Sequence, residues 1–433
     1  MENNVYDIVI IGAGASGLMF ASSFCLGEDP ARPAMSGIIL EGTQKAGSKL
    51  LMSGGGRCNI THGGSIKDFL NAYGAAGTLF RKTLYKHSNY ELASWLDSKG
   101  MRLAGDNGRM LDLSGGARSL DGIGRIFPAS LKAQDVLDLF LNEAHKNGWE
   151  LHTNAKVYGL KRAEVCETKP EAGRNDNSDI DKDKRDDVWE ILLEEGLLIY
   201  AHNVVIASGG ITYPETGSDG SILDMLEGLG IGVSRPRPAL APVYIRDYPY
   251  AELSGITIPD VTVTAYSSDA SCTCNGKAAR MTGDLLFTHN GFSGPVILNI
   301  SKYAESGERI RLSYNKELSG LPSRMQRVLE ERAIGPSGDI RTTALAALLD
   351  HDDFVVDRVS DRGMVTAGGI TLNEIDMSTM RIKSFDSGSG DMYVIGEAID
   401  ADGITGGYNL QLCWSTAATA ASALEMSIDS CVF

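Results

Sequence analysis

The segment 6–41 restricts the possible folds of this chain more than any other. The run YDIVII at 6–11 predicts a buried strand, GAGASG follows directly at 12–17, and the residues after it have helical character. Glycines in the spacing G-x-G-x-x-G make a tight turn, let a pyrophosphate approach the backbone and allow close helix–strand packing. A second predicted strand at 37–40 ends in Glu41, where a carboxylate can accept hydrogen bonds from both ribose hydroxyls.

This order of elements predicts a dinucleotide site in a Rossmann-like α/β domain. The predicted contacts are Gly12, Ala13, Gly14, Ala15, Ser16, Gly17 and Glu41. A glycine-rich turn in some other α/β fold is the alternative, and the acid favours FAD or NAD over NADP. A nucleotide-triphosphatase loop is rejected, because GTQKAGSK at 42–49 has the order Gly-Ser-Lys, which would displace the lysine from the phosphates.

Charge and cysteine content narrow the class of protein. The 433 residues carry a formal charge of −16, which disfavours nucleic acid and anionic membranes as partners. The seven cysteines are scattered and odd in number, so they form no disulfide framework and suit a reducing cytosol. Residues 8–26 are uncharged, but the residues before them include no Lys or Arg, the wrong flank for a signal peptide or membrane span. We expect a cytoplasmic protein without a metal site.

Two further glycine-rich segments favour FAD over NAD. A nicotinamide dehydrogenase would continue with βα units after its second strand, whereas an extended glycine-rich segment follows Glu41 here. Its predicted flavin contacts are Lys49, Leu50, Gly54, Gly55, Gly56, Arg57, Cys58 and Asn59. Near the C-terminus, the sequence predicts a strand at 392–395, a glycine turn and a helix from about Leu410, whose N-terminus could stabilise negative charge on a reduced flavin. The predicted contacts there are Gly396, Glu397, Gly406, Gly407, Tyr408, Asn409 and Leu410.

Several motifs together resemble one known family. They are GGGRCN at 54–59, GRIFPASLKAQDVL at 124–137, VVIASGGITYPETGSDG at 204–220, LLFTHNGFSGPVILNIS at 285–301, VTAGGITLNEIDMSTMRIKS at 365–384 and GEAIDADGITGGYN at 396–409. With them the sequence resembles the BaiN/YhiN-like family of FAD-dependent oxidoreductases over nearly its whole length.

The resemblance implies a Rossmann-like FAD-binding domain at 1–215 and 363–433, interrupted by an inserted mixed β and helical domain at 216–362. The alternating pattern over 243–266 and the helical patterns SRMQRVLEERA and RTTALAALLD support this division, and the prolines at 234–242 indicate a connection. By similarity to related flavoproteins, the backbone of Val157 would contact adenine. Ser208, Gly209 and Gly210 would lie near the pyrophosphate.

The sequence departs from the family pattern at two places. A loop-like insertion at 105–128 replaces a short link and is expected to reshape one rim of the site. A charged, apolar-poor insertion at 166–187 is expected to be a solvated or disordered hairpin tip without a catalytic role.

No catalytic residue is assigned from the sequence. Cys58 has no nearby cysteine partner, so a packing role beside the flavin is preferred over redox or covalent chemistry. Arg57 could place a cation near the flavin or fix the loop through an ion pair. His289 is a candidate proton donor or acceptor, although a lone histidine is more often structural. Tyr213 and Tyr408 could each cover the flavin ring or donate a proton.

The resemblance implies an oxidoreductase that reduces an activated C=C bond of a small organic substrate. NAD(P)H is the expected transient electron donor, and it would dock without a dinucleotide domain of its own, because no second Rossmann motif is present. A substrate-reduced amine or aminoketone oxidase is the alternative, and an RNA-modifying flavoprotein is disfavoured by the charge. If a flavin lies on the glycines of SGGGRCN, Gly55→Val is expected to reduce FAD retention more than folding.

Overall fold

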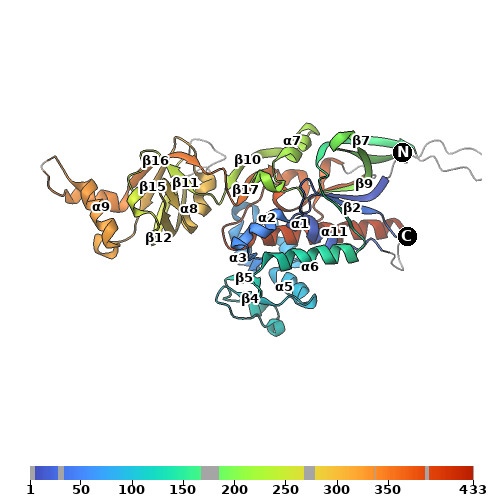
Figure 1. The fold of residues 1–433 in the computed structure, drawn as a ribbon, viewed down its shortest axis with the longest axis horizontal. Coiled ribbons are helices and arrows are strands. Elements are labelled where there is room, and N and C mark those ends of the chain that lie inside the picture. Colours follow the sequence, from blue (N-terminus) through green and yellow to red (C-terminus); the bar gives the residue numbers. More distant parts are fainter. Residues whose placement is uncertain are drawn as a thin grey trace, which may run out of the picture. The chain divides into compact units, whose positions relative to one another are not determined.

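The computed structural model describes residues 5–27, 34–166, 185–267, 278–336, 338–385 and 390–432 (Figure 1). Contacts group the chain into two compact units, Met1–Pro236 with Gly368–Phe433 and Arg237–Ala367. The boundaries between these units lie at 236/237 and 367/368, whereas the boundaries of the expected domains lie at 215/216 and 362/363. The first boundary lies later in the chain than expected because α7 (Ser221–Gly228) packs against β7 (Val157–Cys166) of the first unit.

The first unit is built on a nine-stranded sheet with the central order β18-β19-β20-β9-β1-β2-β6. β1 pairs in parallel with β2 on one side and β9 on the other, and β20 runs parallel to β9. β7 and β8 form an antiparallel hairpin that joins the sheet through β9. The strands are β1 (Val5–Ile11), β2 (Gly37–Leu40), β6 (Glu150–His152), β7 (Val157–Cys166), β8 (Arg185–Leu193), β9 (Leu198–Ile206), β18 (Ile375–Asp376), β19 (Arg381–Ile382) and β20 (Met392–Val394).

Helices α1 (Ala15–Ser23), α6 (Ala133–Lys146) and α11 (Tyr408–Val432) pack together in the first unit. Phe140 of α6 stacks on Trp414 of α11 with ring centroids 4.9 Å apart, and both rings are fully buried. Shorter helices precede them: α2 (Ser48–Met52), α3 (Ile66–Ala72), α4 (Arg81–Lys86) and α5 (Asn89–Ser98). The predicted Rossmann-like α/β fold is confirmed, together with its strands at 6–11 and 37–40. Within the described ranges, no helix is both long and apolar enough to cross a membrane.

A small sheet of order β3-β5-β4 begins shortly after the glycines at 54–56. Its strands are β3 (Thr61–His62), β4 (Leu103–Gly105) and β5 (Arg125–Pro128). The insertion at 105–128, expected as a loop, therefore begins and ends in strands of this sheet and contains the 3-10 helix η3 (Leu113–Leu120). The chain closes tightly here, because a Cβ on Gly63 would lie 2.1 Å from the Ile123 carbonyl oxygen.

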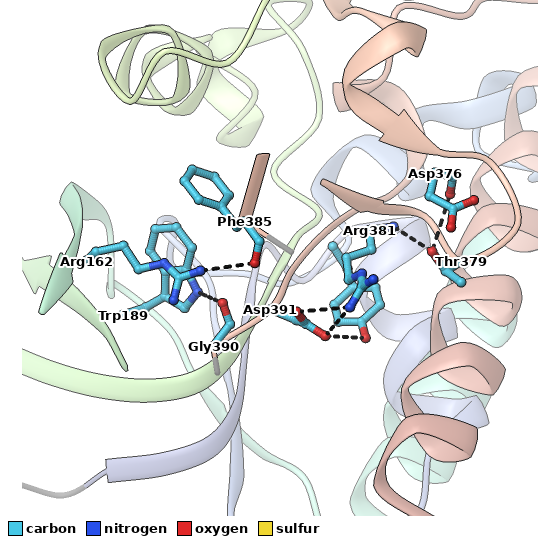
Figure 2. Close-up of polar contacts among 9 residues, drawn as sticks. Arg162, Trp189, Asp376, Thr379, Arg381, Phe385, Gly390 and Asp391 are labelled. Carbon is cyan, nitrogen blue, oxygen red and sulfur yellow. Dashed lines mark hydrogen bonds and ion pairs between the residues drawn. The ribbon is translucent and has the colours of Figure 1, made fainter. Parts of the chain in front are cut away.

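One arginine joins the β7–β8 hairpin to the segment before β20 (Figure 2). The Arg162 guanidinium lies 4.7 Å from the ring centroid of Trp189 and donates to the Phe385 carbonyl at 3.3 Å. The Trp189 indole donates to the Gly390 carbonyl at 3.1 Å. Arg381 and Asp391 form an ion pair nearby, at 3.2 Å. Residues 167–184, most of the expected hairpin-tip insertion at 166–187, lie outside the described residues.

The second unit contains a closed barrel of order β11-β14-β13-β12-β15-β16. Its strands are β11 (Val243–Ile245), β12 (Thr257–Ala265), β13 (Ala279–Phe287), β14 (Gly291–Ser293), β15 (Arg309–Ser313) and β16 (Asp352–Val359), and its helices are α8 (Pro295–Ile300), α9 (Ser323–Ala333) and α10 (Thr342–Asp350). The helical patterns at 323–333 and 341–350 match α9 and α10. The prolines at 234–242 lie partly within β10 (Val233–Ala239), which forms a two-stranded sheet with β17 (Val365–Ile370). The first compact unit passes into the second at 236/237, so this segment does connect the two units, and part of it is also a strand. Proline is compatible with a strand whose amides are not all needed for pairing.

Candidate functional site

The three glycines of the first turn are favoured at their positions for different structural reasons. Gly12 has φ +110°, and a Cβ there would lie 2.5 Å from the Ala207 carbonyl oxygen at the end of β9. A Cβ on Gly17 would lie 2.0 Å from the Gly12 carbonyl oxygen, so the first turn of α1 needs this glycine to pack. A Cβ on Gly14 would meet no protein atom within 4 Å. The chain therefore explains the first and third glycines itself, whereas Gly14 borders open space, as a phosphate-contacting glycine should.

Glu41 is fixed beside this turn and is only 6% exposed. Its Oε2 accepts a hydrogen bond from the Ala13 amide at 3.1 Å, and its Oε1 accepts from the Thr43 amide and hydroxyl at 2.8 and 2.7 Å. The Ala155 amide donates to the Glu41 carbonyl at 2.8 Å, which brings the start of β7, and with it Val157, toward the same place. The predicted ribose and adenine contacts thus lie on one side of the turn. Their roles stay predictions.

The glycines at 54–56 are explained mainly by backbone conformation. Gly54, Gly55 and Gly56 have φ of 58°, 67° and 83°, and Cys58 follows with φ 55°. A Cβ on Gly54 would lie 2.9 Å from the Asn59 amide nitrogen, whereas a Cβ on Gly55 would meet nothing within 4 Å. The left-handed conformation alone favours glycine at all three positions. A close flavin is therefore an additional reason for this sequence and is not required by it.

The two glycine segments that the sequence predicts as flavin contacts meet in the structure. A Cβ on Gly407 would lie 2.6 Å from the Thr61 carbonyl oxygen and 2.9 Å from Oδ1 of Asn59. The Asn59 Oδ1 atom is buried and has no hydrogen-bond partner in the described part of the chain. Buried polar atoms are nearly always hydrogen-bonded, so an unpartnered amide oxygen at this junction is a position for a ligand donor.

A partly buried ion pair joins the helix after β2 to the segment after β20. Lys49 Nζ lies 2.6 Å from Oε2 of Glu397 and donates to the Thr212 hydroxyl, also at 2.6 Å. Gly396 must be glycine, because a Cβ there would lie 2.5 Å from the Ser16 hydroxyl at the start of α1. The predicted residues of the first turn (12–17), of the segment 49–59 and of the C-terminal segment 396–410 are thus adjacent. Thr212 was not predicted from the sequence.

Ser208 completes this wall of the site. A Cβ on Gly12 would lie 2.9 Å from the Ser208 Cα, and the Ser208 hydroxyl is buried without a hydrogen-bond partner among the described residues. Gly209 has φ +78°, and a Cβ there would lie 3.7 Å from Oε2 of Glu397. Gly210 follows as a buried residue. The structure therefore places 208–210 next to the first turn, and their contact with a pyrophosphate stays a prediction.

The N-terminus of α11 is fixed by its own first residues. Asn409 accepts a hydrogen bond from the Gly403 amide at 2.7 Å and donates to the Gly403 carbonyl at 3.0 Å. The Tyr73 hydroxyl donates to the Tyr408 carbonyl at 2.7 Å. The Tyr408 ring stacks on His62 with centroids 4.9 Å apart and planes 19° from parallel. His62 was missed by the sequence reasoning although it lies three residues after Asn59, because its contact with α11 is visible only in the fold.

The thiols of Cys58 and Cys413, the two cysteines described near these residues, are not activated. Cys58 is fully buried, and burial raises its pKa to about 12, only partly offset by a hydrogen bond with Ser53. Burial likewise raises the pKa of Cys413 on α11 to about 12. Both thiols therefore stay protonated at neutral pH, which agrees with the packing role preferred for Cys58. Among the residues that the structure describes, no group of His, Cys, Asp and Glu is arranged to hold a metal ion.

The remaining candidates are placed as follows. Arg57 is exposed, donates to the Gly54 carbonyl at 3.1 Å and lies over the Phe127 ring at 5.2 Å, and these two contacts hold it against the loop. Leu50 is buried in α2 at 3% exposure. Tyr213 has φ 58° and precedes a short 3-10 helix. His289 is exposed in the turn between β13 and β14 of the second unit.

The first unit fits an FAD. Gly14 borders open space, Ser208 Oγ and Asn59 Oδ1 are buried without partners, and α11 begins beside the second glycine segment. Backbone amides and unpartnered polar atoms along one path suit a dinucleotide whose phosphates lie at helix N-termini.

Comparison with known proteins identifies the family. Residues 6–423 match the HI0933-like protein Rossmann domain. The ribosomal RNA dihydrouridine synthase of Haemophilus influenzae is 27% identical, with 94% of this chain and 96% of that protein covered. The 3-dehydro-bile acid delta(4,6)-reductase of Clostridium scindens is 25% identical over the same shares. A solved 3-ketosteroid-delta4-(5alpha)-dehydrogenase from Rhodococcus jostii is 15% identical, covers 97% of each chain and has a TM-score of 0.44.

The family match spans almost the whole chain, and it confirms the resemblance drawn from the motifs. The chain belongs to the HI0933-like family of FAD-dependent oxidoreductases with a Rossmann domain.

Proposed function

We propose that this protein uses FAD to reduce a C=C bond conjugated to a carbonyl group in a small organic substrate, with electrons from NAD(P)H. The observation that carries the proposal is the full-length similarity to a delta(4,6)-reductase of a 3-oxo bile acid. The name of the second relative, a dihydrouridine synthase, also denotes saturation of a C=C bond beside a carbonyl. The two substrates differ greatly in size, so the shared feature is the reaction at the double bond.

The described residues divide into binding and orienting groups. The amides of 14–17 would hold the pyrophosphate at the N-terminus of α1, because these four amide donors precede the first intrahelical hydrogen bond. Lys49, Glu397 and Thr212 form a connected polar group that would fix the cofactor between the two glycine segments. Bound FAD would supply the hydride-transfer chemistry. The buried, protonated Cys58 supports a mechanism without a dithiol.

NAD(P)H is proposed as a transient donor. The sequence contains one G-x-G-x-x-G unit followed by a strand ending in an acid, and that unit is assigned to FAD. A donor that binds, transfers its hydride and leaves needs no second dinucleotide fold. The substrate-reduced oxidase remains the alternative with the same cofactor site.

An RNA substrate is the second candidate, and the name of one relative favours it. The charge of −16 opposes it, but that charge is not evenly distributed. The second unit, residues 237–367, carries 14 Lys and Arg against 16 Asp and Glu, so most of the acidic excess lies in the first unit. The second unit is thus the part of the chain with less repulsion toward a polyanion.

Anaerobic rapid mixing tests the proposal. The purified FAD-containing protein is mixed with NADH or NADPH while the visible absorbance of the flavin is followed, and bleaching is expected with at least one of them. The reduced protein is then mixed with 2-cyclohexenone, a 3-oxo-4,6-diene bile acid or a uridine-containing ribosomal RNA transcript. Reoxidation by a small enone supports the proposal, and reoxidation by the transcript alone favours the RNA candidate. Bleaching only by amines or alcohols would replace it with the oxidase.

A further inference from the structure

His62 lies where the first glycine segment enters β3, and its backbone is fixed on both sides. The Asn89 side chain donates to the His62 carbonyl at 2.9 Å, and β3 pairs with β5 through His62 and Arg125. The imidazole Nδ1 lies 2.7 Å from the Gly63 carbonyl oxygen. Because a carbonyl can only accept, Nδ1 carries a hydrogen in this arrangement. The tautomer is therefore determined by the chain, and Nε2 is the nitrogen that can exchange a proton.

The imidazole is also oriented by its neighbours. Its plane stacks on Tyr408, the first residue of α11. The ring edge that bears Cδ2 faces the C-terminal glycine segment, since a Cβ on Gly406 would lie 3.3 Å from that carbon. Nε2 lies on the same ring edge as Cδ2, away from the Nδ1 hydrogen bond. It has no hydrogen-bond partner within the described ranges of the chain. His62 is only partly buried, so this edge can reach a bound molecule.

One carboxylate stands close enough to influence both rings. The Asp68 carboxylate accepts hydrogen bonds from the Ser65 amide and hydroxyl, both at 2.8 Å, at the N-terminus of α3. These bonds lower its pKa, and His62 adds a smaller lowering effect. The pKa of Tyr408 is raised mainly by burial and further by Asp68. The raised pKa keeps the Tyr408 phenol neutral, and the Asp68 carboxylate is a fixed negative charge near both rings.

We propose that His62 is the acid that protonates the substrate carbon during reduction. The inference rests on the proposed function. Saturation of a conjugated C=C bond takes a hydride at one carbon and a proton at the other. The hydride comes from NAD(P)H, which leaves as NAD(P)⁺. The Nε2–H bond of the imidazolium breaks as the C–H bond forms, His62 becomes neutral, and water returns the proton. Tyr408, which is 7% exposed and covered by His62 and Phe69, serves as the platform that holds the ring.

Two variants and two electron acceptors test this role. His62→Gln retains a polar side chain but cannot act as an acid, and His289→Gln removes the other candidate histidine. Both are expected to retain FAD and to be reduced by NAD(P)H at rates within about twofold of the parent protein. Reoxidation by 2-cyclohexenone is expected to be about 100-fold slower or more in His62→Gln alone. Reoxidation by ferricyanide, which takes electrons without protonating carbon, is expected to be unchanged in both.

A measurement on the unmodified holoenzyme does not depend on the variant. With ¹⁵N-labelled histidine, 2-cyclohexenone added to the oxidised protein is expected to shift the Nε2 signal of His62 and to leave its Nδ1 signal nearly in place. An unshifted Nε2 signal at saturating enone would overturn the proposal.

The kinetic outcomes separate this inference from the proposed function. Equal enone reoxidation in His62→Gln and the parent protein overturns the role of His62 alone, as does slow enone reoxidation confined to His289→Gln. Slow reoxidation of His62→Gln by both acceptors identifies a structural defect and also overturns it. A parent protein that NAD(P)H reduces but no enone reoxidises overturns the proposed function, and the acid role with it.

Discussion

The ammonium group of Lys49 lies 2.6 Å from Oε2 of Glu397, although 348 positions separate the two residues in sequence. Lys49 follows β2, and Glu397 follows β20. Thr212, after β9, is hydrogen-bonded to both. The ends of three strands of one sheet are thus joined by a single polar group, at the edge where parallel sheets bind their ligands.

We expect Lys49→Met and Glu397→Gln each to raise the dissociation constant of FAD by about tenfold or more, about 1.4 kcal/mol. Each change leaves one member of a partly buried pair without its partner, which is costly at side-chain exposures of 24% and 16%. Flavin fluorescence during titration of the apoprotein measures the constant. Lys161→Met is the control, because Lys161 pairs with Glu190 at 65% exposure, away from these residues. If Lys49→Met and Glu397→Gln bind FAD as tightly as the control variant, the ion pair does not contribute to the cofactor site.

Gly14 and Gly17 are expected to respond differently to the same substitution. In Gly14→Val the new side chain meets open space at φ −85°, so the apoprotein is expected to unfold at a nearly unchanged temperature while FAD binding is lost. In Gly17→Val the Cβ would clash with the Gly12 carbonyl, and folding itself is expected to fail. Thermal unfolding with and without FAD distinguishes the two. Normal FAD binding by Gly14→Val would contradict the assignment of this turn.

Gly55→Val is a weaker test than the sequence suggested. At φ 67°, valine costs about 1–2 kcal/mol in the left-handed region before any ligand is considered. A loss of stability is therefore expected in the apoprotein as well. For this reason Gly14→Val separates cofactor binding from folding better.

Cys58 is expected to be chemically inert in the folded protein. Burial raises its pKa to about 12, so the thiolate, which is the reactive form, is nearly absent at pH 8. Iodoacetamide at pH 8 followed by peptide mass spectrometry is expected to label the exposed Cys25 and to leave Cys58 and Cys413 unmodified. In urea both of these thiols are expected to react. Rapid labelling of Cys58 in the native protein would reopen a redox role.

Arg332 is expected to matter for the stability of the second unit, and more at pH 7 than at pH 5. Asp352 is 1% exposed and accepts hydrogen bonds from Tyr314 at 2.9 Å, from Tyr250 and from Arg332 at 3.0 Å. Burial raises the pKa of Asp352, and Arg332 opposes that rise. In Arg332→Met the folded-state pKa rises further above its unfolded value. The buried charge then costs about 3 kcal/mol at high pH, and the cost falls as protonation neutralises the carboxyl.

Urea unfolding of this variant at both pH values, with hydrogen exchange of β16 amides to locate the effect, measures that dependence. Arg327→Met is the matched control on the same helix, because the Arg327–Glu252 pair is exposed at 60% and 43%. The control is expected to change stability by at most about 1 kcal/mol at either pH. A deficit of Arg332→Met that is larger at pH 5 would contradict the charged state assigned to Asp352.

Local sequence patterns predicted the individual elements well. The β-branched runs at 6–11 and 37–40 became β1 and β2, and the periodic segment at 323–333 became α9, because strand and helix periodicities are properties of short stretches. The strand β10 was not predicted in the proline-containing segment 234–242, because its pairing partner β17 lies more than 120 positions later. A strand tolerates a proline only where the pairing partner does not need a hydrogen bond from the amide of that residue.

The sequence by itself determined the strand–turn–helix unit, because glycine spacing and a terminal acid act within some forty residues. Further glycine-rich segments and motifs along the chain indicated the kind of cofactor and the family. Only the tertiary structure decided which residues meet. Lys49 finds Glu397, Asn59 lies against Gly407, and His62 stacks on Tyr408. These contacts span roughly 350 positions, and no local pattern encodes them. They arise because β1 is flanked by β2 and β9 and β9 is flanked by β20, so that the ends of strands far apart in sequence come to one edge.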